Sequence, residues 1–265
     1  MVPARHNRLL KQLYRDNAPH YEDCIAPVMA VLAAGLLRCT QLRPADHVLD
    51  IGAGTVVVAG LAAPHVRHVT AADFSGPMLA VARRQRPAGI AFVRADAHAL
   101  PCRAAAFDLA LANFCFNETR PAIALAEVQR TLRPGGRLAL QEWGPPDPLT
   151  ALADQTLAEY ATDQAYGFQA EMRQLAAFER PWDRAVAAPQ DIEALLLQAG
   201  FDEACGRETA ASVPFATCQA FIDYMLAWST RRVEVEAMPE SRRRAFYHAL
   251  RARLDHGGAV VVVGA

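Results

Sequence analysis

Three aspartates recur at a constant interval in the first half of the chain. Asp50, Asp73 and Asp96 lie 23 residues apart, and each follows a short apolar segment. Such segments predict strands, and the stretch between two of them has room for one helix, which is the repeat of a parallel sheet. Ligands of these sheets bind outside the carboxyl ends of the strands. The spacing therefore predicts a ligand site lined by three carboxylates.

Glycines follow the first of these aspartates. Gly52 and Gly54 lie between the strand that ends at Asp50 and a helical pattern that begins at Thr55. Glycines in such a turn let a ligand approach the backbone closely. Asp73 follows about 20 residues later, where a nucleotide-binding fold places the carboxylate that accepts hydrogen bonds from ribose hydroxyls. The pattern predicts a nucleoside-containing cofactor.

The sign of the charge separates two classes of nucleotide cofactor. A diphosphate such as that of NAD would lie beside Asp50, and like charges held close in a partly buried site repel each other. A cationic ligand is favoured there instead. The dinucleotide pattern G-x-G-x-x-G also requires a small residue at position 57, where this chain has Val57. A nicotinamide oxidoreductase is therefore the weaker hypothesis.

Six segments of the chain match, in order, the sequence words of one enzyme family. They are Asn17–Glu22, Val48–Thr55, Asp73–Leu79, Ala95–Pro101, Phe107–Asn113 and Glu127–Gly136. On these words the chain resembles the class I S-adenosylmethionine-dependent methyltransferases, in particular the branch similar to ubiquinone and menaquinone methyltransferases. The resemblance implies an α/β fold, with a doubly wound, mostly parallel seven-stranded sheet of the Rossmann-like type and helical cap insertions.

The resemblance also implies S-adenosylmethionine as the cofactor and a role for each matching residue. Gly52, Ala53 and Gly54 would contact its methionine moiety, and Asp50 would organise that turn and address the ammonium group. Asp73 would hold the ribose hydroxyls.

The adenine side of the cofactor falls on the next two matching words. By the same resemblance, Phe74 and Met78 would pack on the adenine, and Asp96 with the backbone of Ala97 would address its amino edge. The residues implied to close the methionine side and to cover the cofactor are Asn113, Phe114 and Tyr21.

One residue of the glycine turn departs from the family pattern. The family commonly has a third glycine at position 56, and this chain has Val56. If residue 56 has helical dihedral angles, valine costs only a little helix propensity. If it requires a positive φ, valine is strained. The sequence leaves both alternatives open.

Methyl transfer to oxygen, nitrogen or a carbon acid needs a base as well as a bound methyl donor. No single residue stands out, and the candidates are His20, Tyr21, Asn117, Glu118 and Glu142. Three hypotheses follow. The first is a small-molecule methyltransferase. The second is a protein with this fold that carries out other chemistry, such as a cyclase or lyase, and the third is a non-catalytic binding module with a degenerate site.

Composition excludes several other classes of protein. A net charge of −1 over 265 residues provides no basic field for nucleic acid. The six cysteines are dispersed and form no C-x-x-C pair, which argues against a zinc site or a disulfide framework. His65 and His68 have an H-x-x-H spacing, but no third ligand lies near them in the sequence. We therefore expect no metal.

The pattern of helices and strands predicts one domain in four parts. Residues 1–40 form an N-terminal helical lid, 41–143 the cofactor-binding core, 144–188 a helical cap insertion, and 189–265 the rest of the sheet with a second helical insertion. The start of the chain is charged, and no apolar run is long enough to span a membrane. We expect a cytoplasmic monomer or homodimer.

Aromatic residues cluster in the predicted caps. They are Trp143, Tyr160, Tyr166, Phe168, Phe178, Trp182, Phe221, Tyr224 and Trp228. A pocket lined with aromatic side chains suits a small apolar or aromatic substrate, although such residues also anchor helices on a sheet. The runs Arg231–Arg232 and Arg242–Arg244 could bind an acidic substrate, but such runs are usually solvated faces.

Overall fold

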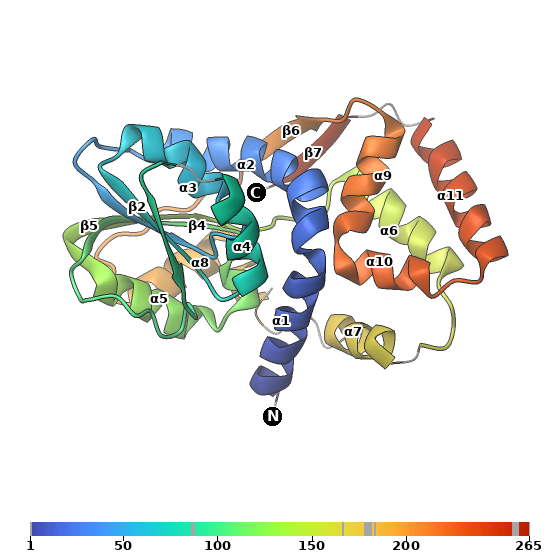
Figure 1. Cartoon of the computed structure of the whole chain (residues 1–265), viewed down its shortest axis with the longest axis horizontal. Helices are drawn as coiled ribbons and strands as arrows, with labels where there is room; N and C mark the ends of the chain where they lie inside the picture. The colour runs from blue at the N-terminus through green and yellow to red at the C-terminus, as the bar shows by residue number, and fades with distance from the viewer. Residues whose placement is uncertain are drawn as a thin grey trace. The chain divides into compact units, whose positions relative to one another are not determined.

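The computed structural model of the chain describes residues 2–85, 88–165, 167–177, 182, 184–255 and 260–264. Its strands are β1 (His47–Ile51), β2 (His68–Asp73), β3 (Ile90–Arg94), β4 (Phe107–Asn113), β5 (Leu132–Gln141), β6 (Ala210–Pro214) and β7 (Val260–Gly264) (Figure 1). Its α-helices are α1 (Val2–His20), α2 (Ala26–Cys39), α3 (Val57–Ala62), α4 (Gly76–Gln85), α5 (Pro121–Thr131), α6 (Pro148–Tyr160), α7 (Gly167–Ala177), α8 (Pro189–Gln198), α9 (Cys218–Ala227), α10 (Ser229–Glu236) and α11 (Glu240–Asp255).

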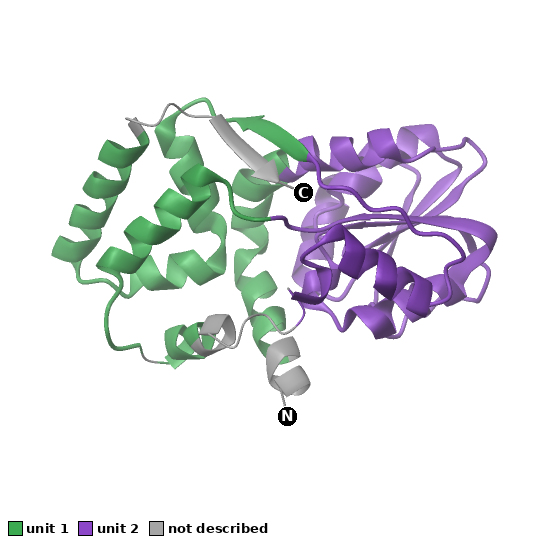
Figure 2. Cartoon of the chain, turned by 180° about the vertical axis from the view of Figure 1, so that it is seen from behind, with its two compact units in different colours: residues 1–28, 145–179, 210–264 green, residues 29–144, 180–209, 265 purple. Residues whose placement is uncertain are grey.

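Contacts divide the chain into two compact units, which Figure 2 colours separately. Residues 29–144, 180–209 and 265 form one of them, here named the sheet unit. Residues 1–28, 145–179 and 210–264 form the other, here named the helical unit. The organisation into a lid, a core and two insertions of one domain stays a prediction.

The sheet unit contains five parallel strands in the order β3-β2-β1-β4-β5. Their register sets Ile51 beside Ala72 on one side and Ala112 on the other. All five strands therefore end at the same edge of the sheet. The residues that follow β1, β2 and β4 meet there, as a parallel sheet requires.

The core of the sheet unit has two layers, one on each face of the sheet. Because successive side chains of a strand point to opposite faces, Val48 packs with α2, α3 and α4, whereas Leu49 packs with α5 and α8. Figure 1 shows α2 and α3 on one side of these strands and α5 on the other. Both faces are apolar, which is typical of a parallel sheet that helices cover on each side.

The predicted seven-stranded sheet is wrong in its strand number. The α/β fold and the parallel sheet are confirmed, but that sheet has five strands among the described residues. Strands β6 and β7 belong to the part predicted to complete the sheet, residues 189–265, but they pair antiparallel with each other. Pro214 lacks an N–H group and suits an edge strand. Which strand β6 pairs with depends on tertiary contacts, because a strand's own pattern does not specify its partner.

The helical unit packs short helices against one another through apolar side chains and ion pairs. Its ion pairs include Arg231 with Asp154, Arg253 with Glu159 and Arg173 with Glu234. Helix α6 begins at a capping residue, Asp147, whose Oδ1 accepts the backbone N–H groups of Leu149 and Thr150. The predicted helical cap insertion, residues 144–188, contains α6 and α7.

The predicted N-terminal helical segment is observed as α1 and α2. A π-helical turn, η1 (Tyr21–Ile25), joins them and interrupts the regular hydrogen-bond pattern. Among the described helices, none combines the length and the apolar character that crossing a membrane would need.

Candidate functional site

The turn after β1 requires glycine at two positions. Gly52 and Gly54 have φ angles of +67° and +55°, which favour glycine. A Cβ atom placed on Gly52 would lie 2.6 Å from Sγ of Cys115, and one on Gly54 would lie 3.4 Å from Cε of Met78. The turn therefore packs closely against the segment after β4 and against α4, and a side chain at Gly52 would displace Cys115.

Val56 completes the turn in a left-handed conformation, with φ +67° and ψ +35°. This resolves the alternatives that the sequence left open, since residue 56 does require a positive φ. Its N–H group donates to the carbonyl of Ala53 at 2.7 Å, and its side chain is buried. A residue other than glycine in this conformation costs roughly 1–2 kcal/mol. Val56 is therefore a strained position in the candidate site.

Asp73 ties the end of β2 to the glycine turn. Its Oδ2 accepts the N–H of Gly54 at 2.8 Å, and its Oδ1 accepts the N–H of Ser75 at 2.7 Å. Burial raises the pKa of Asp73, and these two hydrogen bonds act in the opposite direction. Each carboxylate oxygen has a second lone pair, so both can accept a further hydrogen bond from a ligand.

Asp50 lies beneath the same turn. Its Oδ2 accepts the backbone N–H of Ala59 in α3 at 3.0 Å, which connects the strand end to the helix that follows. Burial raises its pKa to about 8; the hydrogen bond from Ala59 lowers this value and the nearby charge of Asp73 raises it. The geometry is that of a residue that organises the turn. A contact of Asp50 with a ligand's ammonium group stays a prediction.

A histidine connects the end of β3 to the loop before α5. His98 Nδ1 lies 2.5 Å from Oδ1 of Asp96, and His98 Nε2 accepts the N–H of Arg120 at 2.8 Å. Because Nε2 is an acceptor, Nδ1 carries the proton and donates it to Asp96. His98 lies in the family-matching segment Ala95–Pro101 but was not among the candidates; the spacing Asp-x-His was the available signal for this contact.

The ends of β4 and β5 carry a stacked aromatic pair. The rings of Phe114 and Trp143 have centroids 3.9 Å apart and an interplanar angle of 19°. Phe114 also has a positive φ, +55°, which is uncommon for a bulky residue and marks a constrained backbone. Beside it, Oδ1 of Asn113 accepts a hydrogen bond from the side chain of Gln141.

Glu142 follows β5 and is buried behind this segment. Its Oε1 accepts the N–H groups of Cys115 at 3.1 Å and Phe116 at 2.6 Å. Burial raises its pKa to about 8, although hydrogen bonds from the backbone of Phe116, Cys115 and Asn117 lower it. Its Oε2 has no hydrogen-bond partner in the described part of the chain, and the same is true of the buried Asn117 Oδ1 and Thr55 Oγ1.

The structure thus brings together most of the residues that the sequence singled out. The glycine turn, Asp50, Asp73, Asn113, Phe114, Asn117 and Glu142 all belong to the sheet unit and follow or end its strands. Cys115 was missed, and its position directly after β4 was the available signal. Burial, then the charges of Glu142, Asp73, Asp50 and Glu118, raise the pKa of its thiol well above the usual value.

Two further candidates lie in the other unit. His20 and Tyr21 end α1 and begin η1, and the ring of Tyr21 contacts that of Trp228 edge to face, with centroids 6.4 Å apart. A role of either in binding or catalysis stays a prediction. Phe221 and Tyr224 are buried in the helical unit as ordinary core residues. Tyr166 and Phe178 lie outside the described residues.

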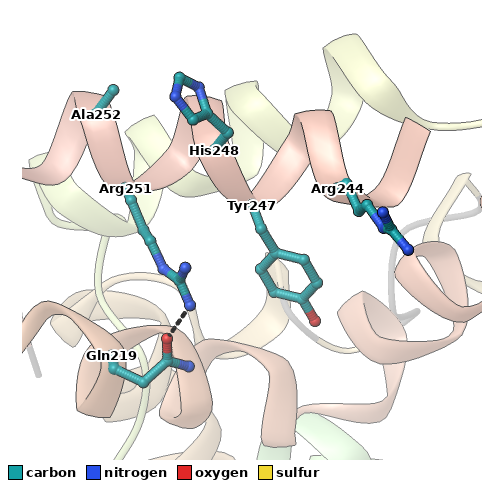
Figure 3. A pocket seen from close by; sticks show the side chains of 6 residues that line it. All are labelled: Gln219, Arg244, Tyr247, His248, Arg251 and Ala252. Atoms are coloured by element: carbon teal, nitrogen blue, oxygen red, sulfur yellow. Dashed lines mark hydrogen bonds between the residues drawn. The ribbon is translucent and has the colours of Figure 1, made fainter. Parts of the chain in front are cut away.

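The predicted arginine runs belong to the helical unit. Arg231 forms a double hydrogen bond with Asp154, and Arg232 donates to Asn17. A hollow of about 620 Å³ lies between α9 and α11 (Figure 3), and its lining residues are Gln219, Arg244, Tyr247, His248, Arg251 and Ala252. Arg251 donates to Gln219 there, and Arg244 pairs with Glu240. The side chains of Arg231, Arg232, Arg244 and Arg251 therefore already contact other residues of the helical unit.

Within the described ranges, no group of three or more histidine, cysteine, aspartate or glutamate side chains is arranged to hold a metal ion.

Comparison with protein families identifies part of the sheet unit. Residues 49–140 match the family described as "Methyltransferase domain". Within the sheet unit, this segment is similar to that domain. The match begins in β1 and ends in β5, so it contains the glycine turn, Asp73 and the β4 end.

Curated proteins similar to this chain include methyltransferases named for quinone biosynthesis. A demethylmenaquinone methyltransferase of Beutenbergia cavernae is 38% identical over 126 residues, which are 46% of this chain and 52% of that protein. A ubiquinone/menaquinone biosynthesis C-methyltransferase of Vibrio vulnificus is 37% identical over 132 residues, 44% of this chain and 50% of that protein. The chain thus spans about half the length of the curated relatives it matches.

A solved structure supports the fold. A protein of Bacillus halodurans C-125 classed as a methyltransferase superposes with a TM-score of 0.53 at 20% identity, and the alignment covers 88% of this chain and 94% of that one. At this identity the likeness concerns the fold alone. It agrees with the α/β architecture of the sheet unit.

Proposed function

We propose that the protein is an S-adenosylmethionine-dependent methyltransferase that acts on a small, apolar or aromatic acceptor. The observation that carries this proposal is the turn after β1. Gly52 and Gly54 both have a positive φ there, and Asp73 accepts the N–H of Gly54. The matching family and relatives support the same reaction class.

The charge of the site supports a cationic ligand. Asp50, Asp73, Glu118 and Glu142 all raise the pKa of the Cys115 thiol, and they therefore act on one small region. A sulfonium or ammonium group bound there would lower the pKa of these carboxyl groups and be stabilised by the negative charge they then carry, whereas a diphosphate would be repelled by that charge.

The residues present fit the proposed cofactor. Gly52 and Gly54 give the turn the positive φ angles with which its backbone would contact a methionine moiety, and Asp73 can accept hydrogen bonds from ribose hydroxyls. Three buried polar atoms at this edge of the sheet have no hydrogen-bond partner among the described residues: Thr55 Oγ1, Asn117 Oδ1 and Glu142 Oε2. Buried polar atoms without partners are uncommon and are explained when a ligand satisfies them.

The assignments on the adenine side are part of the same proposal. Phe74 and Met78 would pack on the adenine, and Asp96 with the backbone of Ala97 would address its amino edge. Asp96 already holds His98, whose ring also accepts the N–H of Arg120. The loop is therefore anchored at both ends.

When bound, S-adenosylmethionine supplies an electrophilic methyl group. The protein then has to hold the acceptor in line and exclude water. The stack of Phe114 on Trp143 provides a flat apolar surface at the ends of β4 and β5, which supports a planar acceptor. Glu142, with a pKa of about 8, is protonated at neutral pH and is a poor base there.

The test is titration of the purified protein with S-adenosylmethionine and S-adenosylhomocysteine by calorimetry, followed by turnover with a panel of small aromatic acceptors. We expect micromolar binding of both, and formation of S-adenosylhomocysteine with at least one acceptor. Acceptor conversion without S-adenosylhomocysteine would instead indicate cyclase or lyase chemistry. Absence of binding would refute the proposal and favour a non-catalytic module.

A further inference from the structure

Glu142 makes contacts that no catalytic role requires. It is 5% exposed, and one carboxyl oxygen accepts two consecutive backbone N–H groups, those of Cys115 and Phe116. These groups begin a short 3₁₀ helix, η3 (Phe116–Glu118). An acceptor at this place satisfies N–H groups that the first turn of a helix leaves unpaired. Glu142 therefore sets the path of the backbone after β4.

The backbone held by Glu142 forms one wall of the glycine turn. The side chain of Cys115 is so close to Gly52 that a Cβ atom there would lie 2.6 Å from Sγ and 2.9 Å from the cysteine Cβ. Cys115 is also buried, so its side chain has little freedom to move away. Any shift of the Cys115 backbone is therefore transmitted to Gly52.

A second hydrogen bond restrains the same segment from β5. The N–H of Phe114 donates to the carbonyl of Gln141 at 2.9 Å, and Gln141 directly precedes Glu142. Phe114 is held with a positive φ between the two contacts. The strained phenylalanine persists because the hydrogen bonds on either side of it fix the backbone.

We propose that Glu142 is a positioning residue of the cofactor site, which holds the backbone at Cys115 and Phe116 so that the Cys115 side chain sets the glycine turn at Gly52. This inference rests on the proposed function for its effect on the cofactor. The arrangement of the segment itself does not depend on that function. Glu142 acts here through Cys115 and not on the reacting atoms.

The variants Glu142→Gln and Glu142→Ala separate this role from others. Glutamine keeps an oxygen that accepts both N–H groups and resembles the protonated carboxyl. Alanine removes the acceptor. Asp46→Asn is the matched control, because Asp46 is also buried in the sheet unit and accepts a backbone N–H, that of Arg43 at 2.9 Å, but at the opposite end of β1.

The first measurement needs no cofactor. Amide hydrogen exchange, read by mass spectrometry on a peptide that covers residues 113–119, reports the N–H groups of Cys115 and Phe116. We expect Glu142→Ala to accelerate their exchange about tenfold or more, because each loses its only acceptor. Glu142→Gln should restore slow exchange, and Asp46→Asn should leave this peptide unchanged. Exchange in Glu142→Ala equal to that of the wild type would overturn the proposal.

The second measurement is the affinity for S-adenosylhomocysteine, by calorimetry at neutral pH with thermal melts that verify folding. We expect binding to weaken about tenfold in Glu142→Ala and to return to within about twofold of the wild type in Glu142→Gln. Equal affinity in all variants would refute the link to Gly52. If the wild type itself bound no cofactor, the proposed function would fail, and the exchange experiment would still decide the role of Glu142.

Discussion

Replacing Val56 with glycine tests whether the left-handed turn is strained. Val56 has φ +67° and is 3% exposed. Glycine would relieve roughly 1–2 kcal/mol of backbone strain. It would also lose about 1.5–3 kcal/mol from burial of the valine side chain and about 0.5–1 kcal/mol from its greater freedom in the unfolded chain. The net expectation for Val56→Gly is a loss of about 1–2 kcal/mol in the free energy of unfolding.

Comparison with alanine isolates the backbone contribution. Val56→Ala keeps the strain and loses two methyl groups, about 1.6 kcal/mol at about 0.8 kcal/mol each. Glycine and alanine should therefore be equally stable at position 56, to within about 0.5 kcal/mol. The control is Ala63→Gly, at a position with φ −52°, where glycine should cost about 0.5–1 kcal/mol relative to alanine.

The assay is urea denaturation of the four proteins at one pH, with the free energy of unfolding extrapolated to water. Calorimetry with S-adenosylhomocysteine on the same samples should give unchanged or tighter binding for Val56→Gly, since the turn keeps its conformation. The reasoning is refuted if Val56→Gly is less stable than Val56→Ala by about 1 kcal/mol or more, the penalty of an unstrained position.

Four further predictions follow from the site. Asp73→Ala should weaken S-adenosylhomocysteine binding by about 1–3 kcal/mol, and unchanged affinity by calorimetry would remove Asp73 from the site. Gly52→Ala should abolish binding, because its Cβ would meet Cys115 at 2.6 Å; normal titration of a folded variant would contradict this. Burial raises the pKa of Glu142 to about 8, so the folded state keeps a proton that the unfolded state releases near pH 4.5. The free energy of unfolding should therefore fall as the pH rises through this window, and it should level off above about pH 8. Urea titrations across that range should show a smaller fall in Glu142→Gln, and an equal fall would show that Glu142 ionises normally. His98→Ala should raise the Kd for S-adenosylhomocysteine several-fold, about 1 kcal/mol, by releasing Asp96, and a Kd equal to that of the wild type would exclude this link.

Local sequence patterns predicted the strands that carry the candidate site. The apolar segments before Asp50, Asp73 and Asp96 are observed as β1, β2 and β3. Parallel strands end at one edge, so the residues after them were expected to meet. That inference needed no tertiary detail, because strands that alternate with helices along the chain run parallel to one another in the sheet.

Long-range packing decided the features that sequence reasoning missed. Val56 was ambiguous because its φ depends on how the turn closes on Asp73 and α3. Glu142 and Cys115 are distant in sequence, and their hydrogen bond exists only because β4 and β5 are neighbours. The same holds for the bridge from His98 to Arg120.

The sequence by itself determined a parallel α/β sheet with a glycine turn and acidic strand ends, because those features depend on residue period, side-chain size and charge within short segments. Only the tertiary structure decided that β6 and β7 pair with each other, that Val56 is left-handed, and that Glu142 is buried with a raised pKa. Strand partners, backbone strain and burial are properties of contacts between distant segments, which no local pattern specifies.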